Sequence, residues 1–343
     1  MKKLSEHFSW RTYLLFTALL IAALLLGICV GSVDIPLGDT VTALWNSLWG
    51  LDIPAGISRS IIMNVRLPRV LNVALVGASL ALCGAAMQGL LRNPLADGST
   101  LGVSSGASLG AVLALALGVT IPGTAYGGTM VMAMAFAFLS LAAILGLAYA
   151  LDRSLTTNSI ILIGVIFSMF ASSVISLVIS FASQNIKSIT FWTMGSLAGT
   201  NFGHTRVLAL ALLICGVIIL RYARELNAFA IGEDNARHIG VNVRRVKLVI
   251  LVAVSVLIGV CVSVSGTIGF VGLVVPHMAR MITGPNHNRL LPSAMFSGAI
   301  FLLLADLAAR TILRPIELSI GVVTSLVGAV AFITIFVRTR KAG

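Results

Sequence analysis

The sequence predicts an all-α integral membrane protein with about ten transmembrane helices, organised as a single domain over residues 1–343. Three observations support this prediction. Hydrophobic residues form 58% of the chain and charged residues only 10%, whereas soluble domains carry about 25% charged residues. Apolar stretches of roughly the 20 residues needed to cross a bilayer recur along the chain. They lie at residues 12–33, 67–91, 100–118, 126–151, 158–182, 205–221, 246–264, 268–283, 292–311 and 317–337.

The third observation is the distribution of basic residues, which accumulate in short cytoplasmic loops. An even number of spans puts both termini on one side of the membrane, and most of the 23 Lys and Arg residues fall on that side. We therefore expect both termini to be cytoplasmic. The net charge of +12 is scattered over loops and span ends, so it indicates topology and contact with membrane lipid, and no nucleic-acid partner is expected.

Two polar connections between spans predict short helices at the outer face. Residues 34–64 contain Trp45 and Trp49, and indole rings favour the membrane interface, so we expect an amphipathic helix there. Residues 183–204 are too polar to cross the membrane and too apolar for a free loop. A short helix that dips into the outer mouth is the expected form, because irregular backbone at depth survives only when it is buried or lines a cavity. This second helix is a candidate lid.

One charged island, residues 225–247, interrupts the apolar chain on the predicted cytoplasmic side. Small and charged residues alternate in this segment, which favours two short helices joined near Gly232. A transport protein that is driven by another subunit needs a contact surface through which that subunit can move it. We interpret the island as such a coupling element, with an ordinary solvated loop as the alternative.

The predicted spans contain few residues that could serve ion coupling, catalysis or metal binding. Asp306 is the carboxylate nearest the middle of a span, and Arg310, one helical turn later, can neutralise it. Coupling to protons or sodium through a buried acid is therefore poorly supported. The sequence contains neither a GxxxxGK(S/T) loop for ATP nor an HExxH metal motif, and His277 alone would supply a single ligand. We predict that the chain is not an enzyme, and that it binds no metal and no cofactor.

Three segments carry a resemblance to a known family. The first contains Arg66-Leu67-Pro68-Arg69, Gln88, Arg92-Asn93-Pro94-Leu95-Ala96 and residues 101–107; the second contains Leu226-Asn227, Gly232-Glu233-Asp234, Ala236 and residues 240–243; the third contains residues 269–280, Asp306, Arg310 and Glu317-Leu318. Over about residues 60–338 the chain resembles the FecCD-type permease subunits of iron-siderophore and vitamin B12 ABC importers.

This resemblance implies a transporter of several subunits in the bacterial plasma membrane. The expected partners are a second permease, either an identical copy or a paralogue, two cytoplasmic ATPase subunits that bind ATP and Mg²⁺, and an external substrate-binding protein or lipoprotein. The expected function is translocation of an iron(III)-siderophore. Cobalamin and haem are alternative cargoes, and an ion-coupled secondary transporter is a further alternative.

The resemblance also assigns roles to individual residues. It implies that an outer cationic rim of Arg66, Arg69 and Arg310 docks the substrate-binding protein, although lipid headgroups could occupy the same arginines. It assigns the ATPase contact to Ala230, Gly232, Glu233, Asp234, Ala236 and Gly240. It places the inner gate at Asn93, Leu95, Thr156, Thr157 and Asn158, where Asn93-Pro94 is equally well explained as a helix stop.

Four positions depart from the family pattern. The family commonly has proline where this chain has Gly98, Thr267, Ser319 and Val330. Such losses are easier to tolerate if a partner permease retains the prolines, which leads to the hypothesis of a heterodimer. The heterodimer in turn favours a siderophore over cobalamin or haem as cargo.

Overall fold

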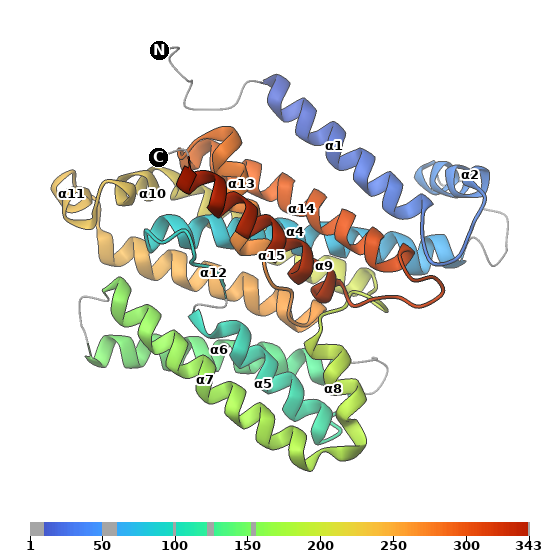
Figure 1. The fold of residues 1–343 in the computed structure, drawn as a ribbon, viewed down its shortest axis with the longest axis horizontal. Coiled ribbons are helices and arrows are strands. Elements are labelled where there is room, and N and C mark those ends of the chain that lie inside the picture. Colours follow the sequence, from blue (N-terminus) through green and yellow to red (C-terminus); the bar gives the residue numbers. More distant parts are fainter. Residues whose placement is uncertain (1–9, 50–59, 99–100, 122–126, 152–155, 342–343) are drawn as a thin grey trace.

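Each of the ten predicted spans corresponds to a helix in the computed structural model (Figure 1). The structure describes residues 10–49, 60–98, 101–121, 127–151 and 156–341, and these ranges contain helices and no β-strand. The helices corresponding to the predicted spans are α1 Trp10–Cys29, α4 Leu67–Leu90, α5 Val103–Ala116, α6 Gly127–Leu151, α7 Thr157–Phe181, α9 Phe202–Arg221, α12 Val243–Ser265, α13 Val271–Thr283, α14 His287–Thr311 and α15 Ile320–Lys341. The all-α prediction is confirmed.

Seven helices in the described ranges are long and apolar enough to cross a membrane, while α5, α13 and the apolar part of α15 are shorter. At a rise of 1.5 Å per residue, a helix of 13 or 14 residues reaches only about 20 Å, against a hydrocarbon core of about 30 Å. Both α5 and α13 begin at a residue with left-handed backbone, Gly102 at φ 73° and Phe270 at φ 67°. Before α5, Ala96, Leu101 and Gly102 are buried, whereas residues 267–270 before α13 are partly exposed. Non-helical backbone at membrane depth needs protein or a cavity around it.

Helix α4 forms the centre of the bundle and packs most extensively on α14. A π-helical turn, η1 Ile61–Arg66, runs directly into α4 and lengthens it. Glycines allow the close approach, since a Cβ placed on Gly77 would lie 2.3 Å from the Gly298 carbonyl oxygen, and a Cβ on Gly298 would lie equally close to the Gly77 oxygen. Small residues that let backbones touch are the usual basis of helix association in lipid.

The predicted short helices are present. Helix α2 covers Leu37–Leu48 and leaves both Trp45 and Trp49 exposed, and α8 covers Ile186–Thr193 after a 3₁₀ turn, η3 Ser183–Asn185. Two further short helices, α10 Ala223–Ala230 and α11 Glu233–His238, project from the opposite end of the bundle (Figure 1). We call these two ends the α2–α8 end and the α10–α11 end.

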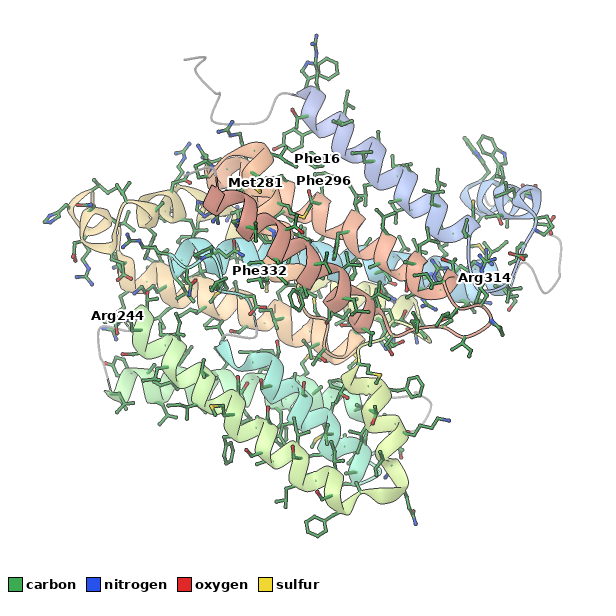
Figure 2. The ribbon with its side chains drawn as sticks, viewed as in Figure 1. Phe16, Arg244, Met281, Phe296, Arg314 and Phe332 are labelled. Carbon is green, nitrogen blue, oxygen red and sulfur yellow. The ribbon has the colours of Figure 1, made fainter. Side chains whose placement is uncertain are left out.

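The bundle has two layers joined by α12. Figure 1 shows α5, α6 and α7 on one side, α1, α4 and α14 on the other, and α12 between them. Aromatic stacking attaches α1 to its layer, with the rings of Phe16 and Phe296 5.6 Å apart (Figure 2). Helix α1 starts and α15 finishes toward the α10–α11 end, as an even number of crossings requires.

Candidate functional site: a docking element, a gate and two cavities

The charged island folds as two short helices, as predicted. Helices α10 and α11 meet at Gly232, whose φ of 118° lies in a region that residues with a side chain rarely adopt. Phe229 in α10 is fully buried and fixes that helix to the bundle, and four residues separate the end of α11 from the start of α12. We call α10, α11 and their connections, residues 223–242, the docking element.

The six predicted ATPase-contact residues are not equally accessible. Ala230, Asp234 and Gly240 are exposed, and Gly232 is half-buried. Ala236 is fully buried, because its methyl group packs into the hydrophobic core, and its part in the ATPase contact stays a prediction. Glu233 also points inward. Its Oε1 lies 2.7 Å from the Lys247 Nζ.

Two exposed isoleucines were missed by the sequence reasoning. Ile231 is 60% exposed and Ile239 is 64% exposed, and they flank α11 on a segment that is otherwise polar at its surface. Exposed apolar side chains outside the spans are a typical sign of a protein contact. The signal was available in the sequence, as two large apolar residues beside the glycines of a charged island.

The predicted gate residues lie at the same end as the docking element. Asn93 uses its Oδ1 to accept a hydrogen bond from the Leu95 amide at 2.9 Å, which is a local turn, and Leu95 is 53% exposed. Thr156 precedes the first residue of α7 and Asn158 is exposed. Thr157 connects the two predicted sites, since its Oγ1 donates to the Glu233 carboxylate at 3.2 Å.

A cavity of about 420 Å³ lies where α5 and α13 begin. Its wall combines the irregular segments before these helices with parts of α4 and α12. The polar and small lining residues are Asp97, Gly98, Ser104, Ser105, Ser108, Thr267, Gly269 and Gly272. Apart from Asp97, these lining residues are small or weakly polar.

Asp97 is the lining residue that the span-by-span reading did not anticipate. It belongs to no helix, but the segment that carries it folds back from the end of α4 to the level of Leu80, near the middle of that helix. Because Asp97 lies in a loop in the sequence, only the fold reveals that its carboxylate lines an internal cavity.

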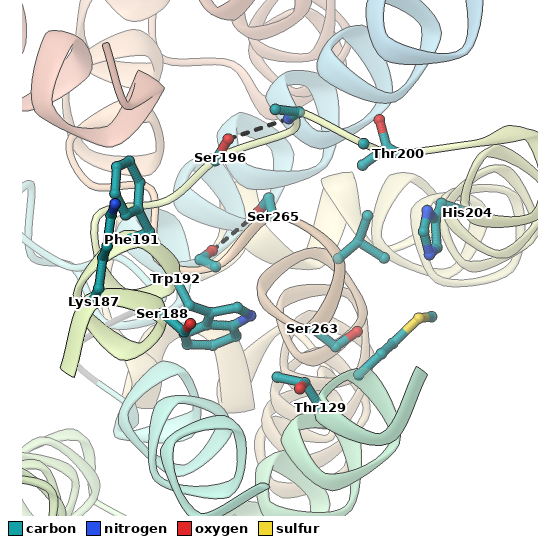
Figure 3. Close-up of a pocket in the computed structure, with 15 residues that line it drawn as sticks. Thr129, Lys187, Ser188, Phe191, Trp192, Ser196, Thr200, His204, Ser263 and Ser265 are labelled. Carbon is teal, nitrogen blue, oxygen red and sulfur yellow. Dashed lines mark hydrogen bonds between the residues drawn. The ribbon is translucent and has the colours of Figure 1, made fainter. Parts of the chain in front are cut away.

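A second cavity, of about 360 Å³, lies at the α2–α8 end between α6, α8, α9 and α12 (Figure 3). Lys187 and Trp192 of α8 form one wall, and His204 of α9 and Ser263 of α12 lie across from them. The predicted lid helix α8 therefore covers a cavity, and whether it opens stays a prediction.

The three predicted docking arginines do not form an exposed rim. Arg66, Arg69 and Arg310 are 4%, 7% and 3% exposed, so docking by these side chains stays a prediction that requires them to become accessible. Asp306 binds two of them. One oxygen lies 2.9 Å from Arg69 and the other 2.8 Å from Arg310, as expected for the Asp306 and Arg310 pair.

Two of these arginines donate hydrogen bonds to backbone carbonyl groups at the end of α1. The last carbonyl groups of a helix have no partner within the helix. Arg66 donates to the carbonyls of Ile28, Cys29 and Val33, while Arg310 donates to those of Gly27 and Val30. Cations also suit the negative end of the helix dipole. The burial of these side chains is therefore explained by the need to satisfy α1.

Glu317, in the loop between α14 and α15, extends this network, and Arg69 lies 2.7 Å from its carboxylate. Burial alone would raise the pKa of the Glu317 carboxyl, but the hydrogen bond and charge of Arg69 outweigh it and the pKa is lowered from 4.5. At neutral pH Glu317 is therefore ionised and paired.

A bundle of apolar helices, short helices around a cavity and one projecting docking element are typical of a membrane transport protein. A family model described as the FecCD transport family matches residues 19–338, so the chain belongs to that family. It is a permease of the ABC importer type and a multi-pass protein of the bacterial inner membrane.

Similar proteins agree with this assignment. The uncharacterized ABC transporter permease protein YvrB of Bacillus subtilis strain 168 is 43% identical over 97% of this chain and 95% of its own length. The hemin transport system permease protein HmuU of Yersinia pestis is 38% identical over 81% of this chain and 84% of its own. Permeases named for vitamin B12 and molybdate import match as well.

A solved structure has the same fold. It is of an inward-facing ABC transporter assigned to the metal-chelate type, with a TM-score of 0.84 and 30% identity, and the match covers 96% of this chain and 99% of that one. The resemblance inferred from the motifs is confirmed.

Proposed function

We propose that this permease translocates an iron(III)-siderophore across the inner membrane, using ATP hydrolysed by separate subunits. One observation supports the division of labour above all. The chain has no nucleotide-binding loop in its sequence, yet it carries a docking element with two exposed isoleucines at one end. The docking element gives two cytoplasmic ATPases a contact surface, while ATP and Mg²⁺ bind to those subunits.

The pathway lies between this chain and a second permease, either a copy or a paralogue. Helix α7 has only 22% of its most apolar window buried within the chain. Its exposed side chains include Ser172, Ser176 and Ser180, spaced at four-residue steps in the half of α7 nearer the α2–α8 end. The Ser176 and Ser180 hydroxyls donate to the α7 carbonyls of Ser172 and Ser176, and small polar residues at this spacing suit close packing against a helix of the second permease.

An external binding protein delivers the cargo at the α2–α8 end. Direct docking on Arg66, Arg69 and Arg310 requires these side chains to exchange their present partners for carboxylates of the binding protein. Arg314 is more accessible, since its side chain is 35% exposed and pairs at 3.0 Å with Asp34, which is 92% exposed. We therefore add Arg314 to the residues that contact the external binding protein.

Haem and cobalamin are the competing cargoes, because relatives named for hemin and vitamin B12 are similarly identical to this chain. The test is uptake into proteoliposomes that contain the permeases, the ATPase and the binding protein encoded beside this gene. We expect ATP-dependent uptake of a radiolabelled ferric siderophore and none of haem or cobalamin. Uptake of another cargo would overturn the siderophore assignment, and uptake that continues with an ATPase unable to hydrolyse ATP would overturn the ABC mechanism.

A further inference from the structure

The two helices of the docking element are fastened to different parts of the bundle. Helix α10 is attached to α14 through Asn227, whose Oδ1 accepts a hydrogen bond from the His287 amide at 2.8 Å and lies 2.9 Å from the His287 Nδ1. Its Nδ2 also donates to the Asn286 Oδ1 at 3.1 Å. These bonds hold α10 against the first turn of α14, in the layer that contains α4.

Helix α11 is attached to the other layer through Glu233. The carboxylate oxygen of Glu233 receives the Lys247 ammonium from α12 at 2.7 Å and the Thr157 hydroxyl from the start of α7 at 3.2 Å. The Lys247 side chain is fully buried and that of Glu233 is 24% exposed. A buried ion pair with an additional hydrogen bond has well-defined geometry, because each charge would otherwise lie unpaired in the interior.

A second contact ties the same region to α6. The guanidinium group of Arg244 lies over the ring of Tyr149, 5.1 Å from its centroid, near the end of α6. Figure 2 shows Arg244 beside the ends of α6 and α7 nearest the docking element. Arg244 and Lys247, less than one turn apart on α12, therefore contact α6 directly and α7 through Glu233.

We propose that Glu233 is an internal strut that passes the movement of α11 to α7, and that it is not itself an ATPase contact. The inference rests on the proposed function. Gly232 lies between the contacts that attach α10 and those that attach α11. Because glycine has no side chain, it tolerates a φ of 118° and lets the backbone change direction at this position. A push on Ile239, at the far end of α11, rotates α11 about Gly232, while Asn227 keeps α10 and the adjoining Ile231 on α14.

Because Glu233 binds Thr157, the rotation carries the start of α7 with it. Thr157 lies among the predicted gate residues. The strut therefore connects the ATPase surface to the gate by direct contacts, and α10 serves as the fixed side of the joint.

The test uses the complete transporter in proteoliposomes and measures three quantities for each variant: association with the ATPase, ATP hydrolysis and cargo transported per ATP. For Glu233→Gln and Thr157→Val we expect normal association and hydrolysis, with cargo per ATP lowered by about tenfold, within the range of typical coupling between sites. Thr157→Ser keeps the hydroxyl group and should behave as wild type. Ile231→Asp combined with Ile239→Asp should instead abolish association.

Folding is controlled with paired variants, since Glu233→Gln leaves the Lys247 charge without its anion. Glu233→Met with Lys247→Met removes both charges at once, which buried pairs often tolerate, and it should fold and uncouple. Glu233→Lys with Lys247→Glu restores the pair and should recover transport in part.

Three outcomes would overturn the strut: loss of ATPase association in Glu233→Gln, normal cargo per ATP in both Glu233→Gln and Thr157→Val, or a charge-swapped pair no better than Glu233→Lys alone. A failure of the proposed function looks different, because the wild-type complex itself would then show no ATP-driven uptake.

Discussion

Asp306→Asn tests how much the buried charge network contributes to stability. Asp306 is 1% exposed and its two oxygens lie 2.9 Å from Arg69 and 2.8 Å from Arg310. Asparagine has nearly the same shape but no charge. The variant keeps the packing around α14 and removes only the anion that two buried cations share.

The expected loss follows from what remains. Arg69 keeps Glu317 at 2.7 Å and Arg310 keeps two carbonyl oxygens at 3.0 Å, but two cations then face one carboxylate. Removing one partner of a buried pair typically costs about 3–5 kcal/mol. The remaining bonds soften this cost, so we expect the free energy of unfolding to fall by about 3 kcal/mol, the lower end of that range.

The control is Asp34→Asn, which breaks the exposed pair with Arg314. A surface pair contributes about 0–1 kcal/mol, so this variant should unfold almost as wild type does. Unfolding in mixed micelles with rising SDS gives the free energy for each variant. If Asp306→Asn is destabilised no more than Asp34→Asn, the network contributes little and our account of the buried arginines is wrong.

Two further predictions concern packing and pH. Gly77→Ala should lower the thermal transition strongly, because the new methyl group would lie 2.3 Å from the Gly298 carbonyl oxygen and overpacking costs about 1–3 kcal/mol. Gly146→Ala in α6 meets nothing within 4 Å and should raise the transition slightly, since alanine favours a helix by about 1 kcal/mol. The lowered pKa of Glu317 means that its pairing with Arg69 stabilises the fold above pH 4.5 and ceases to do so as the pH falls through the folded pKa. At pH 7 the thermal transition of the wild type should therefore lie at a higher temperature than that of Glu317→Gln. This difference should disappear below pH 4.5, and a difference independent of pH would contradict the prediction.

The sequence was sufficient to predict the helices but not the depth of their connections. Ten apolar stretches gave ten helices, because hydrophobic length is a direct consequence of bilayer thickness. The sequence did not indicate that residues before α5 and α13 line a cavity, since these residues are ordinary small and polar ones. Asp97 lies in such a connection, and its place in the cavity wall became visible only in the fold.

The arginines show a second limit of sequence reasoning. Their position near the outer ends of spans suggested a surface role, and nothing in the local sequence states which carbonyl groups lack partners. Arg66 and Arg310 are buried because the end of α1, far away in the sequence, presents carbonyl groups that need donors. Docking by these residues stays a prediction, and it now includes the cost of releasing α1.

The contacts of Asn227 and Glu233 attach the two helices of the docking element beside different walls of the cavity that Asp97 lines. Leu80 of α4 and Gly272 of α13 form one wall, and Ser108 of α5 and Ile258 of α12 form the other. Asn227 fastens α10 to the layer of the first wall, and Glu233 fastens α11 to α12 and α7 beside the second. Any change in the angle between α10 and α11 would therefore move one wall of the cavity relative to the other. A partner subunit that touches only the exposed tip of the docking element would in this way alter the shape of a cavity whose lining residues it does not contact.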